Sequence, residues 1–167
     1  MGGHRCERYG LRRDLSVALA EWGGVESRAT GVSEPARART ERHSNLANLE
    51  VAFGSSLCIP SEWPSGYGNL SCYLDVFPNG RRVYRVVVAG GAGSDVSILG
   101  FSGGALPQPG RRGWHLASLG SDVVLVRECA GRWEAALERS GLRVQVLNYP
   151  SRPDVLWAAQ HLVDIDS

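Results

Sequence analysis

The sequence lacks lysine altogether: its 18 basic residues are all arginine, and 17 acidic residues leave a net charge of +1. A dedicated nucleic-acid-binding protein normally has a basic face, and a polybasic membrane anchor needs a cationic cluster, so this balance argues against both classes. No uncharged apolar run approaches the roughly 20 residues of a membrane-spanning helix. The first residues contain no apolar stretch typical of a secretory signal. We therefore expect a cytoplasmic protein that binds neither nucleic acid nor membrane.

Closely spaced cysteines are also missing. Cys6, Cys58, Cys72 and Cys129 stand far apart, whereas structural zinc sites are built from pairs of ligands a few residues apart. We interpret them as free thiols in a reducing compartment, and we predict no metal and no cofactor. The length of 167 residues and the hydrophobic fraction of 43% are typical of about one globular domain.

Residues 1–45 differ from the rest of the chain. Leu11, Leu15, Ala18 and Trp22 fall on one stripe of an amphipathic helix that ends at Gly23. Residues 25–44 contain almost nothing to bury, which predicts a flexible linker. The predicted division is therefore a helix plus linker at 1–45 and a single domain at 46–167. The helix at residues 9–22 is expected either to cap the core or to bind a protein partner.

A β-hairpin is the strongest local prediction. Residues 70–77 alternate apolar and polar side chains, and residues 81–89 contain a second β-branched run. Asn79 and Gly80 lie between the two runs, and both residues tolerate the positive φ of a primed turn. The pattern predicts an antiparallel hairpin over residues 70–89.

The C-terminal part of the chain has a different pattern. Apolar runs at 96–101, 123–126 and 142–147 predict strands, and segments 109–119, 130–140 and 153–163 predict helices between and after them. Ser151 is the expected N-cap of the last helix, with Asp154 three residues on. Strands alternating with helices indicate a three-layer α/β fold with a parallel or mixed, Rossmann-like βαβαβα sheet.

Two glycine-rich segments follow predicted strands. In an open parallel sheet such loops gather at one rim, where their backbone N–H groups can approach a phosphate. Simple turn formation is the alternative for each loop, and paired arginines at 111–112 could hold a phosphate or carboxylate. The predicted ligand-binding residues are Gly91, Gly93, Ser94, Ser102, Gly103, Gly104, Arg111 and Arg112.

The segment from Ile98 onward resembles a known family. A strand entering a glycine-rich loop at 98–105, strand-like runs at 119–126 and 144–147, and a short helix at 153–163 are similar to the nucleotide-sugar-binding C-terminal half of GT-B-fold glycosyltransferases. The resemblance implies that Ser102, Gly103 and Gly104 face a nucleotide-sugar. The family's later Gly- and Glu-containing loop and its acceptor-binding half are absent, which implies a ligand-binding remnant.

The residues Gly100 to Gly104 also fit the G-x-S-x-G pattern of a nucleophile elbow, with Ser102 as the nucleophile. Asp122 or Asp154, followed by His161, completes the chain order of a hydrolase triad. Three hypotheses stay open: a nucleotide or nucleotide-sugar binder, a non-catalytic interaction module that uses the N-terminal helix and linker, and a small serine hydrolase. Whether the protein is an enzyme is not decided by the sequence.

Overall fold

The computed structural model describes residues 37–91 and 94–165. The predicted parallel or mixed α/β fold is wrong: the chain forms an eight-stranded sheet in which every neighbouring pair is antiparallel. In spatial order its strands are β1 (Arg39–His43), β3 (Gly68–Val76), β4 (Arg82–Ala89), β5 (Val96–Phe101), β9 (Leu142–Tyr149), β8 (Arg132–Arg139), β7 (Asp122–Cys129) and β6 (His115–Leu119).

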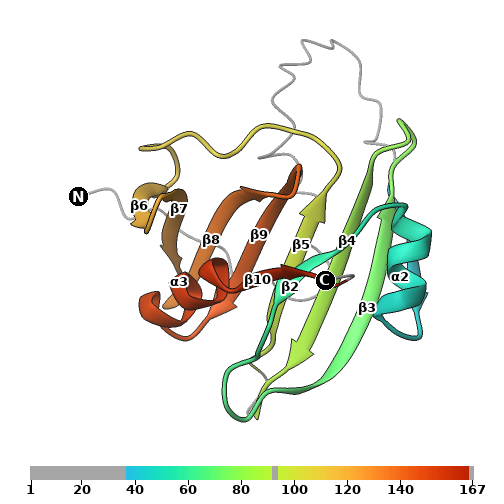
Figure 1. Cartoon of the computed structure of the whole chain (residues 1–167), viewed down its shortest axis with the longest axis horizontal. Helices are drawn as coiled ribbons and strands as arrows, with labels where there is room; N and C mark the ends of the chain where they lie inside the picture. Colours follow the sequence, from blue (N-terminus) through green and yellow to red (C-terminus); the bar gives the residue numbers. More distant parts are fainter. Residues whose placement is uncertain (1–36, 92–93, 166–167) are drawn as a thin grey trace.

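A second layer covers one face of this sheet. It consists of α2 (Leu46–Phe53), α3 (Arg152–Gln160), and a two-stranded ribbon of β2 (Cys58–Pro60) and β10 (Leu162–Asp164). In Figure 1, α2 lies over β3 and β4, while α3 lies over β8 and β9. The ribbon passes between the two helices, so the described residues form two layers instead of the predicted three.

Tight turns explain why the C-terminal part is antiparallel. Ala130 and Gly131 join β7 to β8, and both residues have positive φ, 52° and 76°. Ser140 and Gly141 join β8 to β9 in the same way, at 51° and 74°. Two central residues with positive φ are the mark of the type I′ turn, whose twist suits an antiparallel hairpin. A two-residue loop leaves no room for the crossover that parallel strands require.

The predicted helices at 109–119 and 130–140 are therefore wrong. Their place is taken by a turn followed by β6 and by strand β8. Ala130, Trp133 and Leu137 follow a helical period in the sequence, but residues 132–139 pair with β7 on one side and β9 on the other. Tertiary pairing overrides the helix-favouring composition of this segment.

The hairpin at 70–89 is confirmed, with β3 and β4 in register from Val76 opposite Arg82. Its turn differs from the predicted one, because only Gly80 has positive φ (81°). The Gly80 N–H donates to the Phe77 carbonyl at 2.9 Å. Pro78 and Asn79 thus occupy the centre of an ordinary turn, and Gly80 follows in the left-handed conformation that suits glycine.

The two described helices have clear start signals. The predicted cap of α3 is confirmed: the Ser151 side chain accepts a hydrogen bond from the Asp154 N–H at 3.2 Å. Helix α2 is not among the helices that the sequence predicted. The Asn45 side chain caps it by accepting from the Asn48 N–H at 2.8 Å, and Gly54 ends it at φ 87°.

Apolar residues pack on both faces of the sheet. The larger cluster fills the space under the helices and the ribbon, and it includes Leu49, Tyr84, Val86, Ile98, Val144 and Val155. A smaller cluster lies on the opposite face and comprises Val83, Leu99, Phe101, Trp114, Leu125 and Ala136. That opposite face also carries the buried polar residues of the sheet, Asp75, Arg127, Glu134 and Gln145.

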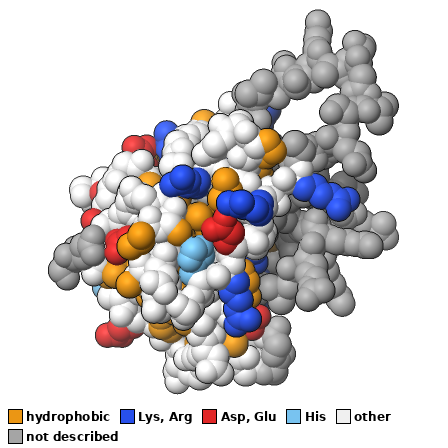
Figure 2. Space-filling view, turned by 90° about the vertical axis from the view of Figure 1, so that its right-hand side faces the viewer, with side chains coloured by type: hydrophobic (Ala, Val, Ile, Leu, Met, Phe, Trp, Pro, Cys, Tyr) orange, Lys and Arg blue, Asp and Glu red, His pale blue; other side chains and the backbone are white. Residues whose placement is uncertain are grey.

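The end of the predicted linker is strand β1, which forms one edge of the sheet beside β3. Figure 2 looks onto the side of the molecule with α2 and this edge, where arginine, acidic and histidine side chains are interspersed with apolar ones. The predicted helix at residues 9–22 lies outside the described residues.

Candidate functional site

The two glycine-rich loops do not meet. The loop with Gly91 and Ser94 joins β4 to β5, whereas Ser102, Gly103 and Gly104 follow the far end of β5. A strand of six residues separates its ends by about 17 Å. The predicted shared rim depends on parallel strands and is wrong, since consecutive antiparallel strands end on opposite sides of a sheet. Gly93 lies outside the described residues.

Local contacts account for both loops. The Ser94 hydroxyl donates to the Gly91 carbonyl at 3.1 Å, and the Ser102 hydroxyl donates to the Arg82 carbonyl at 3.4 Å. Gly103 and Gly104 have φ values of 93° and 110°, which favour glycine. These features are typical of turns.

The predicted arginine pair lies in a third place. Arg111 and Arg112 are exposed in the turn before β6, where the Gly110 N–H donates to the Trp114 carbonyl at 2.8 Å. The pair is therefore part of a turn that begins the edge strand.

The proposed hydrolase residues are also dispersed. Ser102 follows the end of β5 that pairs with the start of β9, whereas Asp154 follows the end of β9. His161 comes seven residues after Asp154, about 10 Å farther along α3. The Nδ1 atom of His161 lies 2.8 Å from the Trp157 carbonyl oxygen, and its ring stacks on the Trp157 indole. Asp122 is on β7, where it pairs with Arg139 at 3.7 Å.

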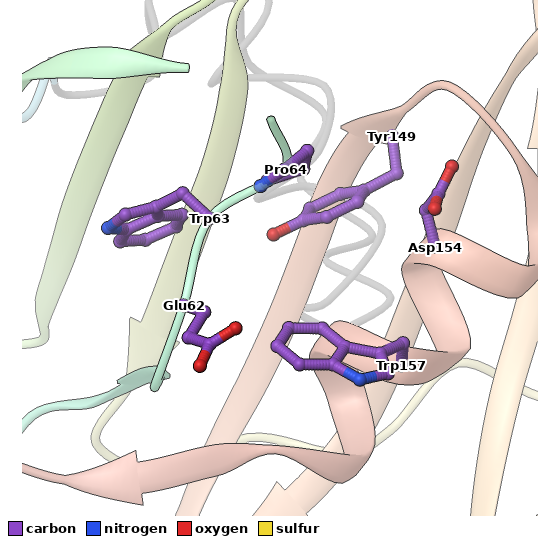
Figure 3. Close-up of a pocket in the computed structure, with 6 residues that line it drawn as sticks. All are labelled: Glu62, Trp63, Pro64, Tyr149, Asp154 and Trp157. Carbon is purple, nitrogen blue, oxygen red and sulfur yellow. The ribbon is translucent and has the colours of Figure 1, made fainter. Parts of the chain in front are cut away.

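An aromatic cleft opens at the end of the sheet where β9 stops. It has a volume of about 290 Å³ and lies between the loop after β2 and the first turns of α3 (Figure 3). We call it the aromatic cleft. Its lining residues are Glu62, Trp63, Pro64, Tyr149, Asp154 and Trp157.

Tyr149 forms the floor of the aromatic cleft. The residue is only 1% exposed, and its hydroxyl has no hydrogen-bond partner. In Figure 3 this hydroxyl points toward the space between Trp63 and Trp157. Burial, followed by the negative charges that Tyr67 and Asp154 can carry, raises the pKa of Tyr149 above its usual value, so the phenol is a neutral donor and acceptor. A buried hydroxyl without a partner is costly, and a bound ligand or water could satisfy it.

Two carboxylates flank the aromatic rings. The Glu62 carboxylate points into the space that Tyr149 faces, and Asp154 lies beyond the Tyr149 ring (Figure 3). Asp154 is held in place at the start of α3, because its carboxylate accepts a hydrogen bond from the Ser151 hydroxyl at 2.5 Å. No arginine or histidine is among the described residues that line the cleft. The side chains that line the cleft therefore carry a net negative formal charge.

The two tryptophan rings that line the cleft differ in burial and in the contacts that hold them. Trp157 is 38% exposed, and its ring is stacked on His161 with centroids 4.3 Å apart. Trp63 is partly buried against the main core. The stack fixes the orientation of the Trp157 ring while leaving the ring accessible. A tryptophan in the polar loop at 60–68 is a sequence signal that could have indicated a surface site.

The neighbouring loop is fixed by hydrogen bonds. Arg132 donates from Nη2 to the Tyr67 hydroxyl at 3.2 Å and from Nε to the Asn148 carbonyl at 3.0 Å. These bonds connect the loop after β2 to β8 and to the end of β9, the two elements beside Tyr149. The loop that carries Glu62 and Trp63 is thereby anchored close to the cleft.

Within the part of the chain that the structure describes, no three His, Cys, Asp or Glu side chains are grouped so that they could hold a metal ion. Neither described helix is long and apolar enough to span a membrane.

Comparison with known proteins found no match among family models, curated proteins or solved structures.

Proposed function

We propose that this protein is a binding module that takes up an organic cation in the aromatic cleft. The group recognised is an ammonium or guanidinium on a short apolar stem. The observation that carries the proposal is the unpartnered hydroxyl of buried Tyr149, which faces the same space as the Glu62 carboxylate and the two indole rings.

The chemistry of the lining supports a cation over an anion. The faces of tryptophan rings carry partial negative charge and attract ammonium and guanidinium groups, most strongly when water is excluded. Glu62 and Asp154 add formal negative charge at the same place. A phosphate or carboxylate ligand would meet repulsion from both carboxylates.

The size of the cleft supports a small ligand or a single side chain. Its volume of about 290 Å³ is just below the roughly 300 Å³ at which typical ligand pockets begin. The described lining contains no serine, cysteine or histidine. Binding is therefore a better-supported function than nucleophilic catalysis.

The predicted interaction helix at residues 9–22 is compatible with a binding module. It lies outside the described residues and remains a separate prediction, with a protein partner as its proposed ligand.

A pair of isosteric probes tests the proposal. Choline and its neutral carbon analogue 3,3-dimethylbutan-1-ol have nearly the same shape but differ in charge. Titration of the full chain, followed by tryptophan fluorescence and by calorimetry, is expected to show saturable binding of choline and weaker binding of the neutral analogue. Equal affinities for the two probes, or stronger binding of a neutral hexose, would overturn the assignment of a cation.

Variants locate the binding. We expect Trp157→Ala to weaken choline binding by about 2- to 30-fold, the range of a cation–π contact of ~0.5–2 kcal/mol. Glu62→Gln removes one charge without changing shape and should also weaken binding. Glu138→Gln is the matched control, because Glu138 is an exposed carboxylate near the turn between β8 and β9, and it should leave the affinity unchanged.

A further inference from the structure

The two edge strands of the sheet differ in whether they carry charged side chains that oppose pairing with a further strand. Edge strand β1 carries the charged residues Arg39, Glu41 and Arg42, and such charges oppose the addition of another strand. Edge strand β6, with the sequence His-Leu-Ala-Ser-Leu, contains no acidic residue and no arginine. The strand therefore lacks the charged side chains that protect β1.

The hairpin geometry determines which backbone groups of β6 are available. Gly120 and Ser121 form a two-residue turn, so Leu119 and Asp122 are the hydrogen-bonded pair that closes it. Hydrogen-bonded and non-hydrogen-bonded pairs alternate along an antiparallel ladder. His115 and Ala117 therefore direct their N–H and C=O groups toward β7. The corresponding groups of Leu116 and Ser118 are directed to the open edge.

Apolar side chains lie next to this edge. Leu116 is 60% exposed and Val123, on β7, is 63% exposed. Both point to the face of the sheet opposite the helices, because Leu116 pairs with Leu125 and Val123 pairs with Ser118. The small Ser118 therefore lies next to both exposed apolar side chains, two residues from Leu116 along β6 and directly opposite Val123 on β7.

We propose that β6 pairs antiparallel with β6 of a second copy of this chain, about a twofold axis at Ala117. In this register Leu116 lies opposite Ser118 of the second copy, so the outward-directed backbone groups of both strands meet. Leu116 then covers the small Ser118 side chain and reaches toward Val123 of the second copy. The symmetry repeats each contact, and the two sheets become continuous.

Charge complementarity favours a second copy as the occupant. The exposed Arg111 precedes β6, and the exposed Asp122, whose carboxylate lies 3.7 Å from Arg139 of its own chain, follows it after the turn. Antiparallel pairing places the start of one β6 beside the end of the other. Arg111 of each copy is thereby brought near Asp122 of the other copy, at both ends of the interface.

Sedimentation of the full chain over a range of concentrations tests this proposal. The wild-type chain is expected to form a dimer at high concentration. Leu116→Lys places a cation in the interface and should raise the dimer dissociation constant by about tenfold or more. Val51→Lys is the matched control, because Val51 is an exposed apolar residue on α2 (83% exposed), and it should leave the constant unchanged.

A charge exchange provides a second measurement that does not depend on Leu116. Arg111→Asp and Asp122→Arg should each weaken the dimer, and the double variant should restore it. A chain that is monomeric at every concentration would overturn the proposal. So would a dimer that is insensitive to Leu116→Lys and to the charge exchange, since its interface would then lie elsewhere.

Discussion

The ring of Tyr84 lies directly over the backbone of Gly100, where a Cβ atom would stand 1.9 Å from Cε1 of that ring. The two residues are paired on neighbouring strands β4 and β5. The Tyr84 hydroxyl continues past Gly100, donates to the Cys58 carbonyl at 2.8 Å and accepts from the Cys58 N–H at 3.1 Å. The glycine thus allows one side chain to connect the sheet to the ribbon.

The first prediction follows from this contact. We expect Gly100→Ala to lower the free energy of unfolding by about 3 kcal/mol or more, at the upper end of overpacking costs, because the neighbouring ring is fully buried. Urea denaturation measures the change. Gly68→Ala is the control, since a Cβ atom there meets no neighbour within 4 Å. The effect of Gly100→Ala should be much smaller in a Tyr84→Ala background, and equal effects in both backgrounds would contradict the explanation.

The second prediction concerns a buried ion pair on the opposite face. Arg127 and Glu134 lie 2.6 Å apart with side chains 5% and 9% exposed, and the Arg127 guanidinium lies over the Trp114 ring at 4.5 Å. We expect Arg127→Met to cost about 3–5 kcal/mol of stability, because it leaves a buried carboxylate without this partner.

The double variant Arg127→Met/Glu134→Leu should recover much of that loss. Arg143→Met provides the comparison, since it breaks the more exposed pair between Arg143 and Glu138, 3.6 Å apart. That change should cost under about 1 kcal/mol. Equal losses for the buried and the exposed pair would show that the ion pair does not contribute as proposed.

The third prediction concerns alkaline pH. Burial, reinforced by the hydrogen bond to Asp164, raises the pKa of the Cys58 thiol from 9.0 to about 12. The folded state therefore retains this proton more tightly than the unfolded state. The resulting stabilisation is complete below pH 9 and is lost as the pH rises toward 12.

Chemical denaturation between pH 8 and pH 11 measures this loss. The decline should be shallower in Cys58→Ala than in the wild-type chain. Some decline should remain in the variant, because burial also raises the pKa of Tyr84 and Tyr149. An identical pH profile for both proteins would contradict the assignment.

The fourth prediction separates stability from binding in the aromatic cleft. Tyr149→Phe removes the buried hydroxyl that has no partner, so we expect the free energy of unfolding to rise by about 1 kcal/mol. The same change should weaken choline binding, because the hydroxyl is proposed to meet the ligand. Thermal denaturation and calorimetry measure the two effects, and a loss of stability would show that the hydroxyl already has a favourable environment.

Short signals in the sequence were predictive where the cause is local. Pro78 to Gly80 predicted the β3–β4 hairpin, since glycine adopts the positive φ required after the turn at the lowest steric cost. Ser151 and Asp154 predicted the start of α3, because the cap satisfies backbone groups within four residues. The predicted type of the turn between β3 and β4 was wrong, because the turn type depends on the twist and register of the two strands.

Longer apolar patterns were misleading where the same residues fit both the period of a helix and that of a strand. Residues 132–139 contain good helix formers and one helical stripe, but they lie between two strands that supply backbone partners on both sides. The signal that distinguishes the two structures is the pair of turns at 130–131 and 140–141. Each turn needs only two residues. The segment after such a turn must run antiparallel beside the strand that precedes it.

The candidate site was beyond what the sequence alone could predict. Glu62 and Tyr149 are 87 positions apart, and their types match no motif. What the chain determined by itself was a set of turns and caps, because these depend on φ preferences and on hydrogen bonds between near neighbours. Only the tertiary structure decided that β9 ends beneath the loop after β2, since the pairing of distant strands and the packing of α3 place those side chains around one cleft.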